Sequence, residues 1–142
     1  RRQRQLCIRD RSHAWFGHER FEYERLAKAG VNVCLGTDSL ASSGRDAAEL
    51  NMFREMREFC ERYPNVSADI VIEMATANGA EALGLDATLG QLREGAQANI
   101  AVIPYENPQV SVSESIVNHV GPVGSLIIAG KRVFSGARSI AN

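Results

Sequence analysis

The pattern of apolar and polar positions divides the chain into a helix-rich part and a strand-rich part. Up to about Gly84, apolar residues recur at helical spacing on either side of one short apolar run, whereas later they form short runs punctuated by glycine and proline. The apolar run, residues 31–35, is interrupted only by Asn32, which is typical of a parallel strand covered on both faces. The sequence therefore predicts an α/β fold with a buried parallel strand at residues 31–35.

Two helices are predicted to flank this strand. Residues 21–29 form a short surface helix that ends at Gly30, a residue suited to a helix C-terminus. Residues 47–63 form a longer amphipathic helix that ends before Pro64 and places these apolar side chains at helical spacings: Leu50, Phe53, Met56, Cys60 and Tyr63.

Two more helices are predicted before the pattern changes. Ser67 caps the first of them, and Asn78 and Gly79 break it. This helix is expected to pack three apolar residues inward: Ile70, Val71 and Met74. The second covers about residues 79–83 and is closed by Gly84.

Short strands are predicted after this change, at residues 90–92, 100–103, 126–128 and 132–134. Residues 129–131 (Ala-Gly-Lys) suit a tight hairpin. These strands resemble one side of a small β-sandwich.

Composition excludes several classes of protein. A net charge of −1 leaves no excess of either sign to attract nucleic acid or an anionic membrane, and the basic residues 1–4 are interpreted as a solvated loop or helix end. No apolar stretch approaches the ~18 residues of a membrane span, and no signal-peptide pattern is present, so a cytoplasmic location is expected. The three cysteines, Cys7, Cys34 and Cys60, show neither a disulfide framework nor a Cys-x-x-Cys metal spacing.

The candidate chemistry lies directly after the buried strand, in Gly36-Thr37-Asp38-Ser39. Catalytic groups of α/β enzymes lie at the carboxyl ends of strands, which favours a functional role for Asp38. The alternative is a structural one, because Asp and Ser are also common in turns and helix caps.

Four stretches of the chain, residues 11–18, 29–39, 74–85 and 89–103, resemble the last part of an amidohydrolase-superfamily barrel, most closely the cytosine deaminase, guanine deaminase and chlorohydrolase branch. The resemblance implies that residues 1–87 are the last βα units of a metal-dependent (β/α)8 barrel. It also implies that residues 88–142 are the C-terminal strands of a composite β-sandwich. The implied activity is hydrolysis of a C–N or related bond in a small polar or heterocyclic substrate, with deamination as the favoured reaction.

The same resemblance implies site residues. Asp38 matches the aspartate that binds a divalent metal, Zn or Fe, and that exchanges protons with the attacking water. His13, Trp15, His18 and Ser39 are the candidates for contacting the substrate, with Trp15 able to stack on a flat heterocycle. In this loop the family more often has the pattern Cys-Pro-x-Ser-Asn, whereas residues 9–13 here are Arg-Asp-Arg-Ser-His. The role of the family's Asn is therefore not transferred to this chain.

The remaining metal ligands of the family are histidines that this chain does not contain. Only His13, His18 and His119 are present, without a His-x-His spacing, and a lone His119 is expected to be a surface or hydrogen-bonded residue. A complete barrel needs ~250 residues, so 142 residues predict a C-terminal fragment that needs the N-terminal part of the barrel.

The fragment interpretation carries structural expectations. The strand at 31–35 should lack both barrel neighbours, and strands 100–103 and 126–134 should have unpaired edges, so the isolated segment should be marginally stable or prone to aggregation. A homodimer is possible.

Two alternatives to the hydrolase stay open at this point. The first is a truncated amidohydrolase-like chain that acts as a non-catalytic binding or assembly module. The second is a flavodoxin-like sheet in which Asp38 accepts a phosphoryl group or binds Mg²⁺. This alternative is less favoured, because only one convincing parallel strand is visible in the sequence.

Overall fold

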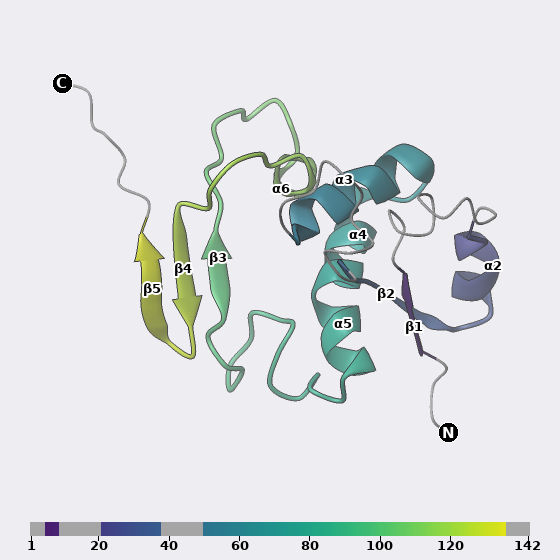
Figure 1. Cartoon of the computed structure of the whole chain (residues 1–142), viewed down its shortest axis with the longest axis horizontal. Coiled ribbons are helices and arrows are strands. Elements are labelled where there is room, and N and C mark those ends of the chain that lie inside the picture. Colours follow the sequence, from purple (N-terminus) through teal and green to yellow (C-terminus); the bar gives the residue numbers. More distant parts are fainter. Residues whose placement is uncertain (1–4, 9–20, 38–49, 136–142) are drawn as a thin grey trace.

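The computed structural model describes residues 5–8, 21–37 and 50–135 (Figure 1). Figure 1 shows the three-stranded sheet at one end of the molecule and most of the helices between it and the two-stranded sheet, with one further helix on the far side of the two-stranded sheet. The elements in chain order are β1 (Gln5–Ile8), α2 (Tyr23–Lys28), β2 (Asn32–Leu35), α3 (Met52–Arg62), α4 (Ala68–Ala75), α5 (Ala77–Ala82), β3 (Ile100–Val102), α6 (Val112–Val117), β4 (Ser125–Ile128) and β5 (Lys131–Ser135).

Strand β2 confirms the predicted buried strand, but it has a neighbour that the sequence did not reveal. Strand β1 pairs with it in parallel, with Gln5 opposite Asn32 and Ile8 opposite Leu35. The expectation that this strand lacks both neighbours was therefore wrong. Four residues between two arginine-rich stretches are too short a run for periodicity to identify as a strand. The parallel pair itself is the arrangement expected of adjacent strands in an α/β fold.

The main hydrophobic core packs helices α3 and α4 against β2. Phe59 and Val71 are completely buried, and Tyr63 and Met74 nearly so, in one cluster with Val33 and Leu35. The rings of Phe59 and Tyr63 stack with their centroids 4.5 Å apart, and the Tyr63 hydroxyl donates a hydrogen bond to the Phe21 carbonyl at 2.7 Å. That bond satisfies the polar end of an otherwise buried ring and connects α3 to the segment that enters α2.

Helix α3 starts later than the sequence pattern predicts. Asn51 is its N-cap, and the Oδ1 of Asn51 accepts a hydrogen bond from the Arg54 amide at 3.2 Å. Leu50 therefore lies before the helix and is exposed, although its spacing matches the apolar face. The predicted end is confirmed, because the helix stops just before Tyr63 and Pro64.

Helix α4 begins at the predicted cap but ends earlier than predicted. The Ser67 hydroxyl accepts from the Ile70 amide, whereas Ile70 itself is exposed rather than packed inward. The break falls at Thr76, with φ −129° and ψ −85°, and the Thr76 hydroxyl donates to the Ile72 carbonyl at 2.7 Å. Asn78 and Gly79, predicted to break the helix, lie within α5 instead.

The three-stranded antiparallel sheet has the order β3-β4-β5. Its hairpin turn is confirmed: Ala129 and Gly130 have φ values of 50° and 76°, as a two-residue turn with left-handed central positions requires. The Asn99 side chain accepts from the Ala129 amide at 2.7 Å and supports this turn. The predicted strand at residues 90–92 was wrong, since that segment is irregular and Leu92 is 83% exposed.

Helix α6 was not predicted, although the sequence contains a signal for it. Ser111 and Glu114 form a capping box, in which each side chain bonds the other residue's backbone amide. The Ser113 hydroxyl bonds Asp69 of α4, and Arg57 of α3 donates to the His119 carbonyl at 2.6 Å. Val117 is buried in the same core as Phe59, so α6 joins the helices to the segment that carries the sheet. The domain division at residues 87 and 88 stays a prediction.

Within the described part of the chain, none of the helices has the length and the apolar character needed to span a bilayer.

Gly90 provides a test of how tightly the loop after α5 packs on that helix. A Cβ at Gly90 would lie 2.8 Å from the Ala80 Cβ and 2.9 Å from the Ala77 Cα, whereas a Cβ at Gly95 meets nothing within 4 Å. Both glycines have positive φ, so Gly95→Ala should cost about 1–2 kcal/mol from the backbone alone. Gly90→Ala should cost about 1–3 kcal/mol more, because the clash involves backbone. Urea unfolding of both variants measures the difference, and equal losses would contradict this packing.

Candidate active site

All of the predicted site residues lie outside the described residues. They are Asp38, proposed to bind metal and carry protons, and the four candidate substrate contacts His13, Trp15, His18 and Ser39. The structure therefore tests none of these roles directly. It does describe the strands from which these segments follow.

The two strands that precede the candidate residues end at one edge of the sheet. Because β1 and β2 are parallel and Ile8 is opposite Leu35, the carboxyl ends of both strands lie side by side. Residues 9–20 follow the first strand end, and Asp38 follows the second after Gly36 and Thr37. The structure thus brings together the two points from which the candidate residues continue, at the edge where α/β proteins place their ligands.

A reciprocal pair of carboxamide hydrogen bonds fixes the start of β2 against α5. Asn32 donates from Nδ2 to the Asn78 carbonyl at 3.0 Å, and Asn78 donates from Nδ2 to the Val33 carbonyl at 2.8 Å. Asn32 is only 6% exposed, so its amide depends on such a partner. Sequence reasoning noted Asn32 only as an exception in an apolar run. A polar residue in a buried strand was the signal that it needs a specific partner.

A buried carboxylate, Glu55, was also missed. It lies in the first turn of α3, the helix after residues 38–49, and is 2% exposed. An acidic side chain is favoured at a helix N-terminus by the helix dipole.

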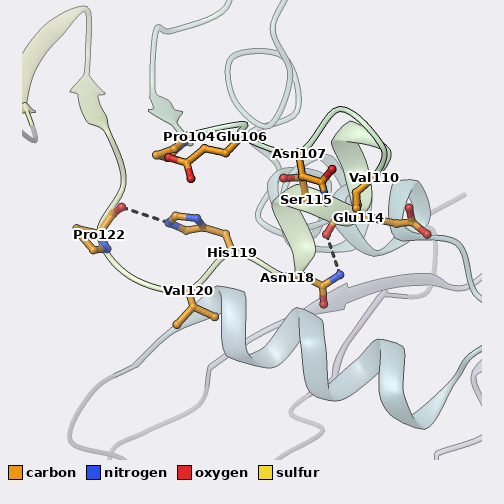
Figure 2. Close-up of a pocket in the computed structure, with 10 residues that line it drawn as sticks. All are labelled: Pro104, Glu106, Asn107, Val110, Glu114, Ser115, Asn118, His119, Val120 and Pro122. Atoms are coloured by element: carbon orange, nitrogen blue, oxygen red, sulfur yellow. Dashed lines mark hydrogen bonds between the residues drawn. The ribbon is translucent and has the colours of Figure 1, made fainter. Parts of the chain in front are cut away.

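A hollow of about 470 Å³ lies beside α6, lined by ten residues shown in Figure 2. Its polar groups mostly serve local structure. Asn118 donates to the Glu114 carbonyl at 2.9 Å, and the His119 Nε2 lies 3.2 Å from the Pro122 carbonyl (Figure 2). The His119 ring also contacts Phe53 edge-on, with centroids 5.1 Å apart. This confirms the expectation that His119 is a hydrogen-bonded residue, and the hollow contains no set of groups converging on a ligand.

A second hollow, of about 570 Å³, lies next to α4 and α5 and is more acidic, with Glu73, Glu81 and Asp86 in its lining. In the ranges 5–8, 21–37 and 50–135, no three His, Cys, Asp or Glu side chains are close enough together to hold a metal ion. The described residues therefore do not supply the ligand set that a metal-dependent hydrolase needs. Asp38 lies outside this test.

A sequence profile of the amidohydrolase family matches residues 2–133. The chain belongs to the amidohydrolase family. The match covers both parallel strands, all of the helices described and the three-stranded sheet up to residue 133, within β5. The family resemblance drawn from the sequence is confirmed.

Individual relatives of this amidohydrolase chain are deaminases. The chain is 37% identical to a 5-methylthioadenosine/S-adenosylhomocysteine deaminase of Thermococcus sibiricus over 124 residues. The aligned stretch covers 78% of this chain and 28% of that protein. The solved structure of a zinc-bound adenosine deaminase from Xanthomonas campestris superposes with a TM-score of 0.82 at 25% identity, over 92% of this chain and 32% of that one. Escherichia coli guanine deaminase superposes with a TM-score of 0.78 at 21% identity, over 94% and 34%, and supports the fold.

The amidohydrolase chain thus spans about a third or less of the proteins it matches. The described elements, with two parallel strands, helices and a three-stranded sheet, correspond to part of a barrel enzyme. The fold class is confirmed at this level, while a complete β-sandwich stays a prediction.

Two cysteines of the amidohydrolase chain, Cys34 and Cys60, lack the character of nucleophiles. Cys34 is buried in β2, and Cys60 is half-buried on α3. Burial raises the pKa of the Cys60 thiol, and the negative charge of Glu61 raises it further. A raised pKa leaves less thiolate at every pH, which is the opposite of what a catalytic cysteine requires.

The pKa of Cys60 can be measured through its alkylation. The rate of carbamidomethylation at the Cys60 peptide, followed by mass spectrometry from pH 7 to ~10.5, should reach half its plateau at a higher pH than free cysteine does. Glu61→Gln should lower the pH of that midpoint, because it removes the negative charge of Glu61, which is the smaller of the two causes of the raised Cys60 pKa. A midpoint below that of free cysteine would contradict the buried environment.

Proposed function

We propose that the complete protein is a metal-dependent amidohydrolase that deaminates a small amino-substituted heterocycle. The observation that carries the proposal is the family match over residues 2–133 together with two parallel strands whose carboxyl ends lie side by side, the second of them ending three residues before Asp38 in the sequence. In the reaction, water adds to the carbon that bears the amino group, the C–N bond breaks, and ammonia leaves with the transferred proton.

Asp38 is the residue we propose for metal binding and proton transfer. A divalent metal, with Zn favoured by the zinc-bound structural neighbour and Fe as the alternative, supplies Lewis-acid activation of the water. A carboxylate at this position can accept the water's proton and return it to the leaving amine. The buried strand β2 supports this role, because precise sites are built on rigid elements and Asp38 follows such a strand in the sequence.

The substrate class follows from what the relatives share. The Thermococcus sibiricus protein and the Xanthomonas campestris protein are named for adenine-containing substrates, which supports a 6-aminopurine nucleoside as the substrate here. His13, His18 and Ser39 are the proposed polar contacts, and Trp15 the proposed stacking surface for the base.

We also propose that turnover requires barrel strands beyond these 142 residues, because the chain matches only 28% of its deaminase relative. Within the chain, residues 1–87 supply barrel elements and residues 88–142 supply the sandwich strands. The homodimer and the cytoplasmic location stay predictions.

Asp38→Asn in the full-length protein is the direct test. Zinc-loaded wild-type protein should release ammonia from 5-methylthioadenosine or adenosine, and Asp38→Asn should lower kcat by about 10²–10⁴-fold, since it removes a general base. Asp69→Asn is the matched control, because Asp69 lies on α4 and bonds Ser113. Its turnover should stay within about twofold of wild type.

Two outcomes would overturn this proposal. Unchanged turnover in Asp38→Asn would remove Asp38 from the chemistry. A zinc-loaded, full-length wild-type protein that turned over none of the aminopurines, guanine or cytosine would favour the non-catalytic binding module instead.

A further inference from the structure

The contact between β2 and α5 is more specific than core packing requires. Val33, Cys34 and Leu35 are buried apolar residues, and apolar contacts are non-directional. They favour burial of the strand without fixing its position along its own axis. The two carboxamide hydrogen bonds between β2 and α5 do have direction, and they join residues 45 and 46 positions apart in the sequence.

The two bonds are reciprocal, which makes the pair a two-point attachment. In one bond the Asn32 side chain of the strand donates to the backbone carbonyl of Asn78 in the helix. In the other, the Asn78 side chain of the helix donates to the backbone carbonyl of Val33 in the strand. Two directional bonds at separate points oppose both sliding and rotation of the strand start relative to α5. Helix α5 also packs closely on the loop that follows it, because Gly90 approaches Ala77 and Ala80 without room for a Cβ.

Asp38 is five residues beyond Val33, at most about 16 Å along an extended chain at ~3.3 Å per residue. The extended backbone of β2 is continuous from Asn32 to Leu35, so a displacement of the strand start would be carried toward its carboxyl end. A displacement of ~1 Å at a reacting group can cost about 10²-fold in rate. The strand's attachment therefore matters for chemistry at its end as well as for stability.

We propose that Asn78 is a positioning residue for Asp38, acting through β2. The inference rests on the proposed function of Asp38 as a metal ligand and proton carrier. Asn78 touches neither substrate nor metal in this proposal. Its carboxamide fixes the Val33 carbonyl and thereby the axial position of the strand that leads to the carboxylate.

Asn78→Ala in the full-length protein is the test, because it removes the side-chain donor, leaves the Asn78 carbonyl for Asn32, and favours helix in α5. Asn118→Ala is the matched control. Its Nδ2 also donates to a backbone carbonyl, that of Glu114 at 2.9 Å, but at the end of α6. Both variants are assayed at least ~15 °C below their own unfolding midpoints, so that the folded protein is compared.

Three quantities are measured: kcat, KM, and the zinc dissociation constant from competition with a chelator in the absence of substrate. Asn78→Ala should lower kcat by about 10–100-fold with KM within about threefold, and should raise the zinc dissociation constant by about 10–100-fold. Asn118→Ala should leave all three within about twofold. If Asn78→Ala is insoluble, Asn78→Gln, which keeps a donor one methylene out of place, gives the same comparison.

The outcomes separate this inference from the proposed function. A lower unfolding midpoint with wild-type kcat and zinc affinity, in either Asn78 variant, would mean that the bond is only structural and would overturn the inference while leaving Asp38 in its role. Wild-type kcat and zinc affinity in Asp38→Asn would overturn both.

Discussion

The arrangement of this chain depends on one constraint, the complete burial of strand β2. All four of its residues are buried, so both faces need cover and its backbone groups need partners away from water. Helices α3 and α4 supply apolar cover through residues such as Phe59 and Val71, and strand β1 supplies a ladder along one edge. The Asn32 amide is the exception in this apolar strand, and its bond to the Asn78 carbonyl connects β2 to α5.

Local signals in the sequence were enough to predict the features that depend on local chemistry. The apolar run at β2, the Gly30 and Ser67 helix ends, and the turn at Ala129 and Gly130 all follow from residue type and short spacing. Strand β1 could not be found in this way, because a four-residue strand is specified by its pairing with β2 rather than by its own sequence. The break at Thr76 likewise depends on a tertiary arrangement in which Asn78 stays helical to reach Val33.

The site was less accessible to sequence reasoning than the fold. Family resemblance led to Asp38, while pattern alone predicted only a polar turn after a strand, and residue 38 lies outside the described residues. What the structure adds is the arrangement of the strands that precede the candidate residues, namely two parallel strand ends side by side and a strand start bonded to α5. Asn78 was visible in the sequence only as a helix breaker, because a side chain's partner 45 residues away leaves no periodic trace.

Helix α6 connects the three-stranded sheet to the helical core. It lies between β3 and β4 in sequence, yet Val117 belongs to the core of α3 and α4, and the Arg57 guanidinium holds the carbonyl just beyond the helix. A genetic crossover near residue 88 that exchanged the sheet between two family members would also exchange one wall of the helical core. Such hybrids would inherit mismatched packing unless the faces of α3 and α4 changed with it. The sheet is therefore not a freely interchangeable module, and its evolution is coupled to that of the helices that pack against β2.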